Sequence, residues 1–416
     1  GTSTAGWTSA DCDYLCDGTH DQIEINNAIT ALPATGGEIV ILDGTYNIGA
    51  KINVTKDNVS IRGNGNATIL KRMYASLNYE GVITLTSRSG CKIANLRIEG
   101  NKSSYNQFYN RNIYLSSSSN NTIAGNICND SNRGISLESS SNYNVVTDNV
   151  CNNNANAGIS LTSSSNDNTI IGNTCNDNVY GITLSTSSNN NTMNGNTCNN
   201  NSTRGLDLNA SSNNTITGNT CNNSSRGFYF NSSSNYNTVT GNTCNDNDYG
   251  IYFNSSSNHN TVTGNTCSNN TYGIYTTFSS NNIITGNTCI RGTGLTTDYT
   301  GSQYTIWVAG TDNNYNLISN NNCMGKAVTV DGGTGNTIID NKWSNSSGRI
   351  LESYSEKLVT VSASGGSINL SLGNVFVHTP SGNRTYSITN AVDGQAHSFT
   401  LIINMGSTVR TLTFPA

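Results

Sequence analysis

Short stretches of alternating apolar and polar residues recur along most of the chain, separated by clusters of Asn, Ser and Gly. One complete unit is NTITGNTCNNSSRGFYFNSSSN, residues 214–235. Since side chains alternate between the two faces of a strand, this unit predicts inward positions for Ile216, Cys221, Phe228 and Phe230, and outward positions for Thr215, Thr217, Thr220 and Tyr229. One unit supplies too few apolar residues for a core of its own. The core therefore forms only when successive units stack.

Cysteine recurs once per unit, at intervals of 22 to 24 residues, from Cys128 to Cys289. The members are Cys128, Cys151, Cys175, Cys198, Cys221, Cys244, Cys267 and Cys289. Stacked residues lie about 4.8 Å apart with parallel side chains, whereas a disulfide needs converging Cβ atoms about 3.8 Å apart. We therefore predict free, buried thiols that act as small apolar side chains. A metal array is the alternative, but no His or carboxylate converges on these positions.

Asparagine also recurs at two positions of the unit. One set is Asn121, Asn144, Asn168, Asn191, Asn214, Asn237, Asn260, Asn282 and Asn316; the other is Asn126, Asn149, Asn173, Asn196, Asn219, Asn242, Asn265, Asn287 and Asn321. Asn is common at turns, and stacked amide side chains can hydrogen-bond to the amides above and below. Two asparagine ladders are therefore expected at the corners of the coils.

The repeat predicts an all-β fold, a right-handed parallel β-helix over residues 38–348. Residues 1–37 are expected to form an N-terminal cap, because Ile25, Ala28, Ile29 and Leu32 mark one side of an amphipathic helix that can cover the open end. Residues 349–416 lose the Asn-rich repeat and alternate as in SINLSL and NVFVHT, which predicts a small C-terminal β module.

Charge and composition narrow the range of partners. The formal net charge is -5 and no cluster of Lys and Arg occurs, which argues against nucleic acid. No apolar run of about 18 residues is present, so membrane insertion is not expected. His20, His259, His378 and His397 are scattered, and neither a metal nor another cofactor is predicted. Only Cys12 and Cys16, in CDYLC, could form a local disulfide or ligand pair.

Two motifs resemble known families. Residues 17–48 read DGTxDxxxIxxAIxALPxxGGxIxxxxGTYxI, which is similar to the N-terminal cap of pectin-lyase-like proteins, including bacteriophage tailspikes. The repeat GIxLxxSSxNxTIxGNTC resembles the NosD-type β-helix repeat of archaeal and bacterial surface proteins. These families include lyases, hydrolases, epimerases and non-catalytic adhesins, so the resemblance implies the fold and carries over no catalytic residue. The C-terminal segment resembles β modules of phage tail proteins, which often trimerise; this implies a homotrimer.

The strand that begins at the recurring glycine varies most on its outer side. Its central outward position reads Tyr114, Ser136, Ser160, Thr183, Asp207, Tyr229, Tyr252, Tyr275, Trp307 and Thr329. Just before the glycines lie Tyr180, Arg204, Arg226 and Tyr249, among others. We name Tyr229, Tyr252, Tyr275 and Trp307 the aromatic ladder. It suits stacking on the rings of an extended sugar chain, although cross-strand stacking that merely stabilises the sheet is the alternative. Insertions at 102–111 and 291–304 fall at one corner beside this strand.

Cleavage of a glycosidic bond usually needs two carboxyl groups, about 5 to 5.5 Å apart for retention or about 6.5 to 9.5 Å apart for inversion. Asp207 is the best single candidate, because Arg204 and Arg226 are expected beside it. The candidates for its partner are Asp177, Asp246 and Glu138. Of these, Glu138 is three coils away, roughly 14 Å by strand spacing, which is too far for direct cooperation.

These patterns predict an extracellular, cell-surface or virion-tail protein that binds a surface polysaccharide and degrades it as a hydrolase or lyase. The alternative is a non-catalytic adhesin or structural spike that uses the same groove only for binding. Ice binding is a minor alternative, suggested by the Thr-x-Thr ladder of Thr215, Thr217, Thr238, Thr240, Thr261 and Thr263. A carboxylate pair at the right distance, or an Asp beside an Arg or Lys, would favour the enzyme.

Overall fold

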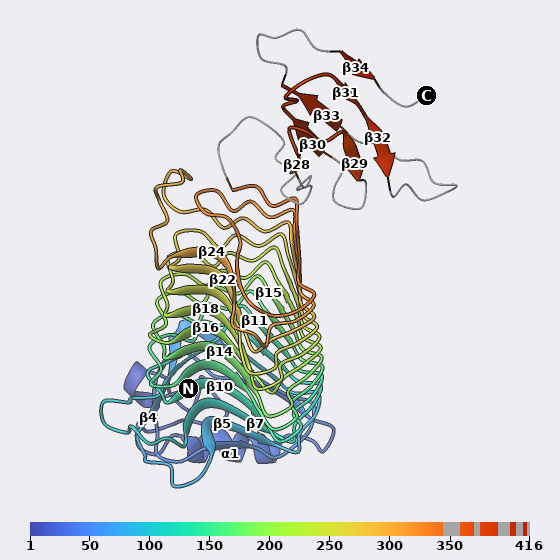
Figure 1. Ribbon diagram of the computed structural model, residues 1–416. Coiled ribbons are helices and arrows are strands. Elements are labelled where there is room, and N and C mark those ends of the chain that lie inside the picture. The colour runs from blue at the N-terminus through green and yellow to red at the C-terminus, as the bar shows by residue number, and fades with distance from the viewer. Residues whose placement is uncertain (344–357, 370–374, 390–399, 405–410, 414–416) are drawn as a thin grey trace. The chain divides into compact units, whose positions relative to one another are not determined.

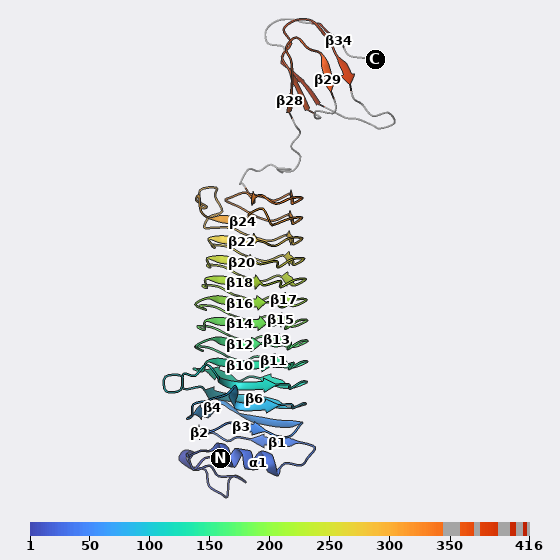
Figure 2. The same cartoon turned by 60° about the horizontal axis from the view of Figure 1, so that its bottom comes forward.

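The computed structural model describes residues 1–343, 358–369, 375–389, 400–404 and 411–413. The chain forms two compact units, residues 1–350 and 351–416. In the first unit the chain winds in stacked coils, and each coil adds one strand to each of two long parallel sheets (Figures 1 and 2). The predicted right-handed parallel β-helix is confirmed.

The 15-stranded sheet carries the asparagine-flanked strands. Its members are β1 (Gly37–Val40), β2 (Gly44–Ile48), β4 (Val59–Arg72), β6 (Lys92–Glu99), β8 (Thr122–Ala124), β9 (Ile127–Asn129), β11 (Val145–Thr147), β13 (Thr169–Ile171), β15 (Thr192–Asn194), β17 (Thr215–Thr217), β19 (Thr238–Thr240), β21 (Thr261–Thr263), β23 (Ile283–Thr285), β25 (Leu317–Ser319) and β27 (Thr337–Ile339).

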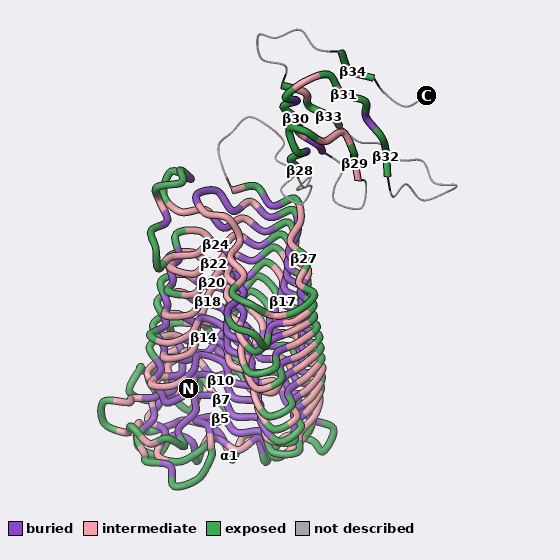
Figure 3. The backbone as a smooth tube through the Cα atoms, in the orientation of Figure 1, coloured by how far each residue is buried: buried purple, intermediate pink, exposed green. Residues whose placement is uncertain are grey.

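The 12-stranded sheet contains the recurring glycines, and we call it the Gly-strand sheet. Its members are β3 (Ile52–Val54), β5 (Glu80–Thr86), β7 (Asn110–Ser116), β10 (Arg133–Glu138), β12 (Ala157–Leu161), β14 (Tyr180–Ser185), β16 (Arg204–Asn209), β18 (Arg226–Asn231), β20 (Tyr249–Phe253), β22 (Tyr272–Thr277), β24 (Tyr304–Ala309) and β26 (Thr329–Asp331). The colours of Figure 3 show that more residues of this sheet are buried at β7 and β10 than at β22.

One continuous core runs through the stack. The eight cysteines from Cys128 to Cys289 are fully buried in it, beside inward residues such as Ile216 and Phe228, and they form no disulfide. The prediction of free, buried thiols is therefore confirmed. Burial raises the pKa of Cys151 and Cys175 well above the ordinary range, because the thiolate loses its water.

We expect thiol titration of the native protein to leave these eight cysteines unmodified, because each is fully buried and no reagent reaches it. The partly exposed Cys12 is an internal positive control. Denaturant should release the buried set. Rapid modification of all eight without denaturant would contradict the buried stack.

The two asparagine ladders are also present. Asn219 shows the pattern: its amide donates to the carbonyls of Met193 and Thr217 and to Oδ1 of Asn242, at 3.0, 3.2 and 3.0 Å. Its own Oδ1 accepts from the backbone and side-chain nitrogens of Asn196, both at 2.9 Å. A third ladder, which the sequence reading did not identify, joins Asn154, Asn178, Asn201, Ser224, Asn247 and Asn270 before the Gly strands. Most of the buried amides in these ladders are thus hydrogen-bonded to groups of the adjacent coil.

The N-terminal end carries a short helix, η1 (Ser3–Ala5), and one α-helix, α1 (Gln22–Ala31). Helix α1 lies across the end of the stack (Figure 2) and buries Ile25 and Ile29, which confirms the predicted amphipathic helix. The carboxylate of Asp21 fixes the entry to this helix, because it accepts backbone hydrogen bonds from Gly18 at 2.8 Å and Asn47 at 2.6 Å.

The described residues of the second unit form three small parallel sheets, one of three strands and two of two strands. Its strands are β28 (Leu358–Val361), β29 (Ser367–Asn369), β30 (Val375–His378), β31 (Arg384–Thr385), β32 (Ser387–Thr389), β33 (Thr400–Ile403) and β34 (Leu412–Thr413). Buried Val361, Ile368, Phe376 and Tyr386 form its core. Among the described residues, no helix has the length and apolar character needed to cross a bilayer.

Candidate carbohydrate-binding face

The outward positions of the Gly-strand sheet form continuous rows along the stack. In strands such as β14 and β22, the first, fourth and sixth residues are partly exposed and the others are buried. The parallel register aligns the fourth positions from Tyr114 through Asp207 and Tyr229 to Trp307 and Thr329. The row expected from the sequence therefore exists, and its members are neighbours in space.

The aromatic side chains form a double row. In the fourth-position row, ring centroids of Tyr252 are 5.0 Å from Tyr229 and 4.8 Å from Tyr275, and Tyr275 is 5.1 Å from Trp307. A parallel row at the first position contains Tyr249, Tyr272 and Tyr304, with stacked contacts of 4.6 and 5.8 Å. The sequence reading gave Tyr304 no role, because the long insertion before β24 obscured its alignment with Tyr272.

Tyr229 differs from the rest of the aromatic ladder and from the sequence-based expectation. Its side chain points outward but only 7% of the residue is exposed. The guanidinium groups of Arg204 and Arg226 lie 4.3 and 4.9 Å from its ring centroid, and its hydroxyl accepts from Asn254 at 3.0 Å. Tyr229 therefore supports its neighbours and does not present a ring face, whereas Tyr252, Tyr275 and Trp307 stay half-buried.

Asp207 lies directly below Tyr229 in the same row and is almost fully buried, with 5% of the residue exposed. The sequence predicted an outward carboxylate beside Arg204 but not this burial, which its neighbours in the adjacent coils produce. Its Oδ1 accepts from Arg204 Nη1 at 3.0 Å, and its Oδ2 accepts from the hydroxyl of Thr183 at 3.4 Å. Burial raises the pKa of Asp207, an effect that Arg204 and the Thr183 hydrogen bond oppose.

Glu138 forms a second cluster with two arginines. Its Oε1 lies 3.2 Å from Arg111 Nη2 and 3.3 Å from Arg133 Nη1. Exposed rings cover this cluster, since the guanidinium of Arg111 is 4.8 Å from the ring of Tyr79 and that of Arg133 is 5.6 Å from the ring of Phe108. The sequence reading did not single out Arg111, although Arg111 precedes Arg133 in the same register.

The structure does not assemble a pair of carboxylates around Asp207. Glu138 lies on β10, three strands from Asp207 on β16, in agreement with the sequence-based estimate. Asp177 and Asp246 are exposed residues with left-handed backbone at the corner before their Gly strands. Among the described residues, neither makes a hydrogen bond or ion pair with Asp207. Arg204, Arg226, Tyr180 and Tyr249 do gather here: the guanidinium of Arg204 is 5.3 Å from the ring of Tyr180, and that of Arg226 is 5.7 Å from the ring of Tyr249.

The arrangement defines a class: a long right-handed parallel β-helix with aromatic and arginine rows on one outer face. The chain belongs to the NosD family, whose model carries the description periplasmic copper-binding protein and matches residues 14–205, 164–271 and 200–382. A search of curated proteins gave no match.

Several solved structures share the fold. The A-module of the mannuronan C-5 epimerase AlgE4 of Azotobacter vinelandii is 18% identical, with a TM-score of 0.67, over 82% of this chain and 99% of that one. Gene product 12 of bacteriophage phi29 is 13% identical, with a TM-score of 0.64, over 89% and 61%. The Dettilon tailspike protein is 15% identical, with a TM-score of 0.61, over 76% and 66%. At these identities the likeness establishes the fold alone.

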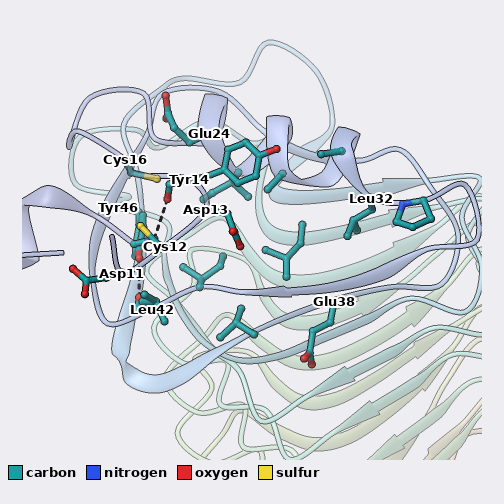
Figure 4. A pocket seen from close by; sticks show the side chains of 18 residues that line it. Asp11, Cys12, Asp13, Tyr14, Cys16, Glu24, Leu32, Glu38, Leu42 and Tyr46 are labelled. Carbon is teal, nitrogen blue, oxygen red and sulfur yellow. Dashed lines mark hydrogen bonds between the residues drawn. The ribbon is translucent and has the colours of Figure 1, made fainter. Parts of the chain in front are cut away.

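The family description names copper, whose preferred protein donors are soft thiolates and imidazole nitrogens. Among the described residues, one group brings possible donors together: atoms of Cys16, Asp21 and Glu24 lie within 4.8 Å of one another. They lie beside a cavity of about 420 Å³ under helix α1, which Cys16 and Glu24 help to line (Figure 4). Burial, and next Asp21, raise the pKa of the Cys16 thiol to about 12, and Asp21 already anchors the backbone.

One protonated thiol with two carboxylates does not match the donors of copper. The eight stacked thiols do not match either, because each is fully buried in an apolar core that offers an ion no entry path. The described residues therefore do not fit copper, and no step below uses it.

Proposed function

We propose that this protein binds a polysaccharide along the outer face of the Gly-strand sheet and degrades it with Asp207 as the proton-transferring group. The carrying observation is the position of Asp207: a buried carboxyl group paired with Arg204, at the end of the aromatic ladder. Burial raises the pKa of this carboxyl group, so it keeps its proton to a higher pH than an ordinary Asp, as a proton-transferring group requires. Two proteins of similar fold, a mannuronan epimerase and a tailspike, support a polysaccharide as the ligand.

The contacts around Asp207 bear on the type of reaction. The carboxyl group of Asp207 is bonded to a guanidinium and a hydroxyl. This one carboxyl group would therefore carry out the proton transfer, and Arg204 would hold it in place. This arrangement supports a lyase more than a hydrolase with two nearby carboxylates. A screen of surface polysaccharides for new reducing ends and for absorbance of unsaturated products separates the two: both signals identify a lyase, and reducing ends alone identify a hydrolase.

A non-catalytic adhesin is the second candidate. It is favoured by the aromatic rings, which stack on one another and so stabilise the sheet whether or not a sugar is bound. Binding of a polysaccharide without either product in the screen would exclude degradation and favour this function.

Replacing Tyr252 with Ala is expected to weaken oligosaccharide binding by about 1 to 3 kcal/mol, by analogy with other aromatic stacking platforms. The ring lies in the middle of the aromatic ladder and is half-buried, so one face can receive a sugar. Calorimetry measures the change. Tyr143→Ala, at a tyrosine that is 60% exposed before β11 of the other sheet, is the control and should bind like the parent. Equal affinity of Tyr252→Ala and the parent would assign the ladder to sheet packing.

We also propose a location outside the cytoplasm, at a cell surface or a virion tail, and association into homotrimers through residues 349–416. The description of the family as periplasmic supports a location outside the cytoplasm. The similarity in fold to a tailspike protein supports a virion tail. Within the described residues of the second unit, the outer strands of the small sheets pair on one side only. This supports association, because such edges readily pair with another chain. A monomeric mass by light scattering would refute the trimer.

A further inference from the structure

Arg226 is a cation without a partner of opposite charge. It is the first residue of β18, and its guanidinium lies 4.9, 5.6 and 5.7 Å from the ring centroids of Tyr229, Tyr252 and Tyr249. Within the described part of the chain the side chain of Arg226 makes no hydrogen bond and no ion pair, and its buried Nε has no acceptor. Three tyrosine rings thus hold a guanidinium in place and remove part of its water, while its donors stay unused.

The neighbouring arginine does not share this property. Arg204 is in register with Arg226 one coil earlier, and its charge is balanced by Asp207 at 3.0 Å. The ion pair of Arg204 and Asp207 is neutral, so the positive charge of Arg226 beside the aromatic ladder is not balanced by an ion pair.

The charge balance of the whole face agrees with this local excess. Within the strands from β7 to β26, the outward rows contain four arginines, Arg111, Arg133, Arg204 and Arg226, and three carboxylates, Glu138, Asp207 and Asp331. The complete chain carries a formal net charge of -5. These strand rows thus hold one more cation than carboxylates on an acidic chain. Arg111, Arg133 and Arg204 are each ion-paired with one of these carboxylates, so the excess lies at Arg226, where an anionic ligand would be attracted.

We propose that the polysaccharide is acidic and that Arg226 binds its anionic substituent, a carboxylate or a sulfate ester. This inference rests on the proposed binding face and names the class of its ligand. A guanidinium offers a planar fork of donors that matches the oxygens of either group, and such charge-assisted bonds are about twice as strong as neutral ones. A sugar ring stacked on Tyr252 would bring its substituent to Arg226, because that ring contacts the guanidinium.

The test compares two matched pairs of probes: polygalacturonate with its carboxyl-reduced product, and dextran sulfate with dextran. We expect the parent protein to bind the acidic member of at least one pair about tenfold more tightly than the neutral member. The pair that shows the preference identifies the substituent. Arg226→Gln should lose the preference and Arg226→Lys should keep part of it, since a lysine retains the charge without the planar fork.

Arg97→Gln is the matched control, because Arg97 lies on β6 of the other sheet with a side chain 41% exposed. It changes the net charge equally and should leave the preference intact. Thermal melting verifies that each variant is folded. Equal binding of acidic and neutral probes by the parent, or an unchanged preference in Arg226→Gln, overturns this inference while leaving the proposed binding face in place. Binding to none of the four probes counts against both proposals.

Discussion

Asp207→Asn is expected to lower kcat on the cleaved polysaccharide by about 100- to 10,000-fold, the range that a general acid or base contributes. Asn keeps the shape of the side chain. Its Oδ1 can still accept from Arg204 and its amide nitrogen can donate to the Thr183 hydroxyl, but it cannot take up or release the proton. Affinity for the substrate should stay close to that of the parent. Product formation in single-turnover experiments measures the loss of catalytic rate, and calorimetry measures the affinity for the substrate.

The pH dependence of this reaction adds a second measurement. Because burial raises the pKa of Asp207, the carboxyl group stays protonated to a higher pH than an ordinary Asp. If it acts as the acid, kcat falls as the pH rises through this pKa; if it acts as the base, kcat rises there. The free energy of unfolding also depends on this pKa. A group whose pKa is higher in the folded than in the unfolded state contributes its full stabilisation below the unfolded-state pKa, and this stabilisation is lost as the pH rises through the folded-state pKa. Asp207→Asn should therefore gain stability relative to the parent with increasing pH.

Asp177→Asn is the control for this experiment, since Asp177 is exposed and lies at the corner outside the Asp207 cluster. It should cleave like the parent. If Asp207→Asn also cleaves like the parent, Asp207 is a structural residue and the proposed catalytic role is wrong.

Asn219→Ala is expected to lower the free energy of unfolding by on the order of 3 kcal/mol, because several buried groups lose their partners at once. The substitution leaves the backbone N–H of Asn196 and the carbonyl of Met193 without this amide, in a position that is fully buried. Water cannot replace the lost bonds without opening the stack. Denaturant titration gives the change in free energy.

Hydrogen exchange locates the same effect. The amide proton of Asn196 should exchange much faster in Asn219→Ala, whereas amides several coils away should change less, because each coil of a solenoid contacts only its neighbours. Thr215→Ala, at an exposed position of the same coil, should stay within about 0.5 kcal/mol of the parent. A similarly small change for Asn219→Ala would show that the ladder does not stabilise the stack.

The sequence alone was enough to predict the coil and its inner lining. One cysteine and two asparagines per unit, at nearly constant spacing, specify which residues stack, since a parallel solenoid places equivalent positions directly above one another. For the same reason the alignment of repeats predicted the outward row from Tyr114 to Thr329. The amphipathic pattern before Pro33 was likewise sufficient to predict helix α1.

Only the tertiary structure decided how far each outward side chain is covered. Tyr229 and Asp207 point outward as predicted, yet both are buried, because their exposure depends on the size and direction of side chains in the coils on either side. The alignment gives the order of those neighbours but not the rotamers that place Arg204 against Asp207 and leave Arg226 among tyrosine rings. Similarly, the pairing of Arg111 with Glu138 follows a loop of irregular length, where spacing no longer reports register. Repetition determines the backbone, whereas side-chain packing between coils determines the chemistry of the face.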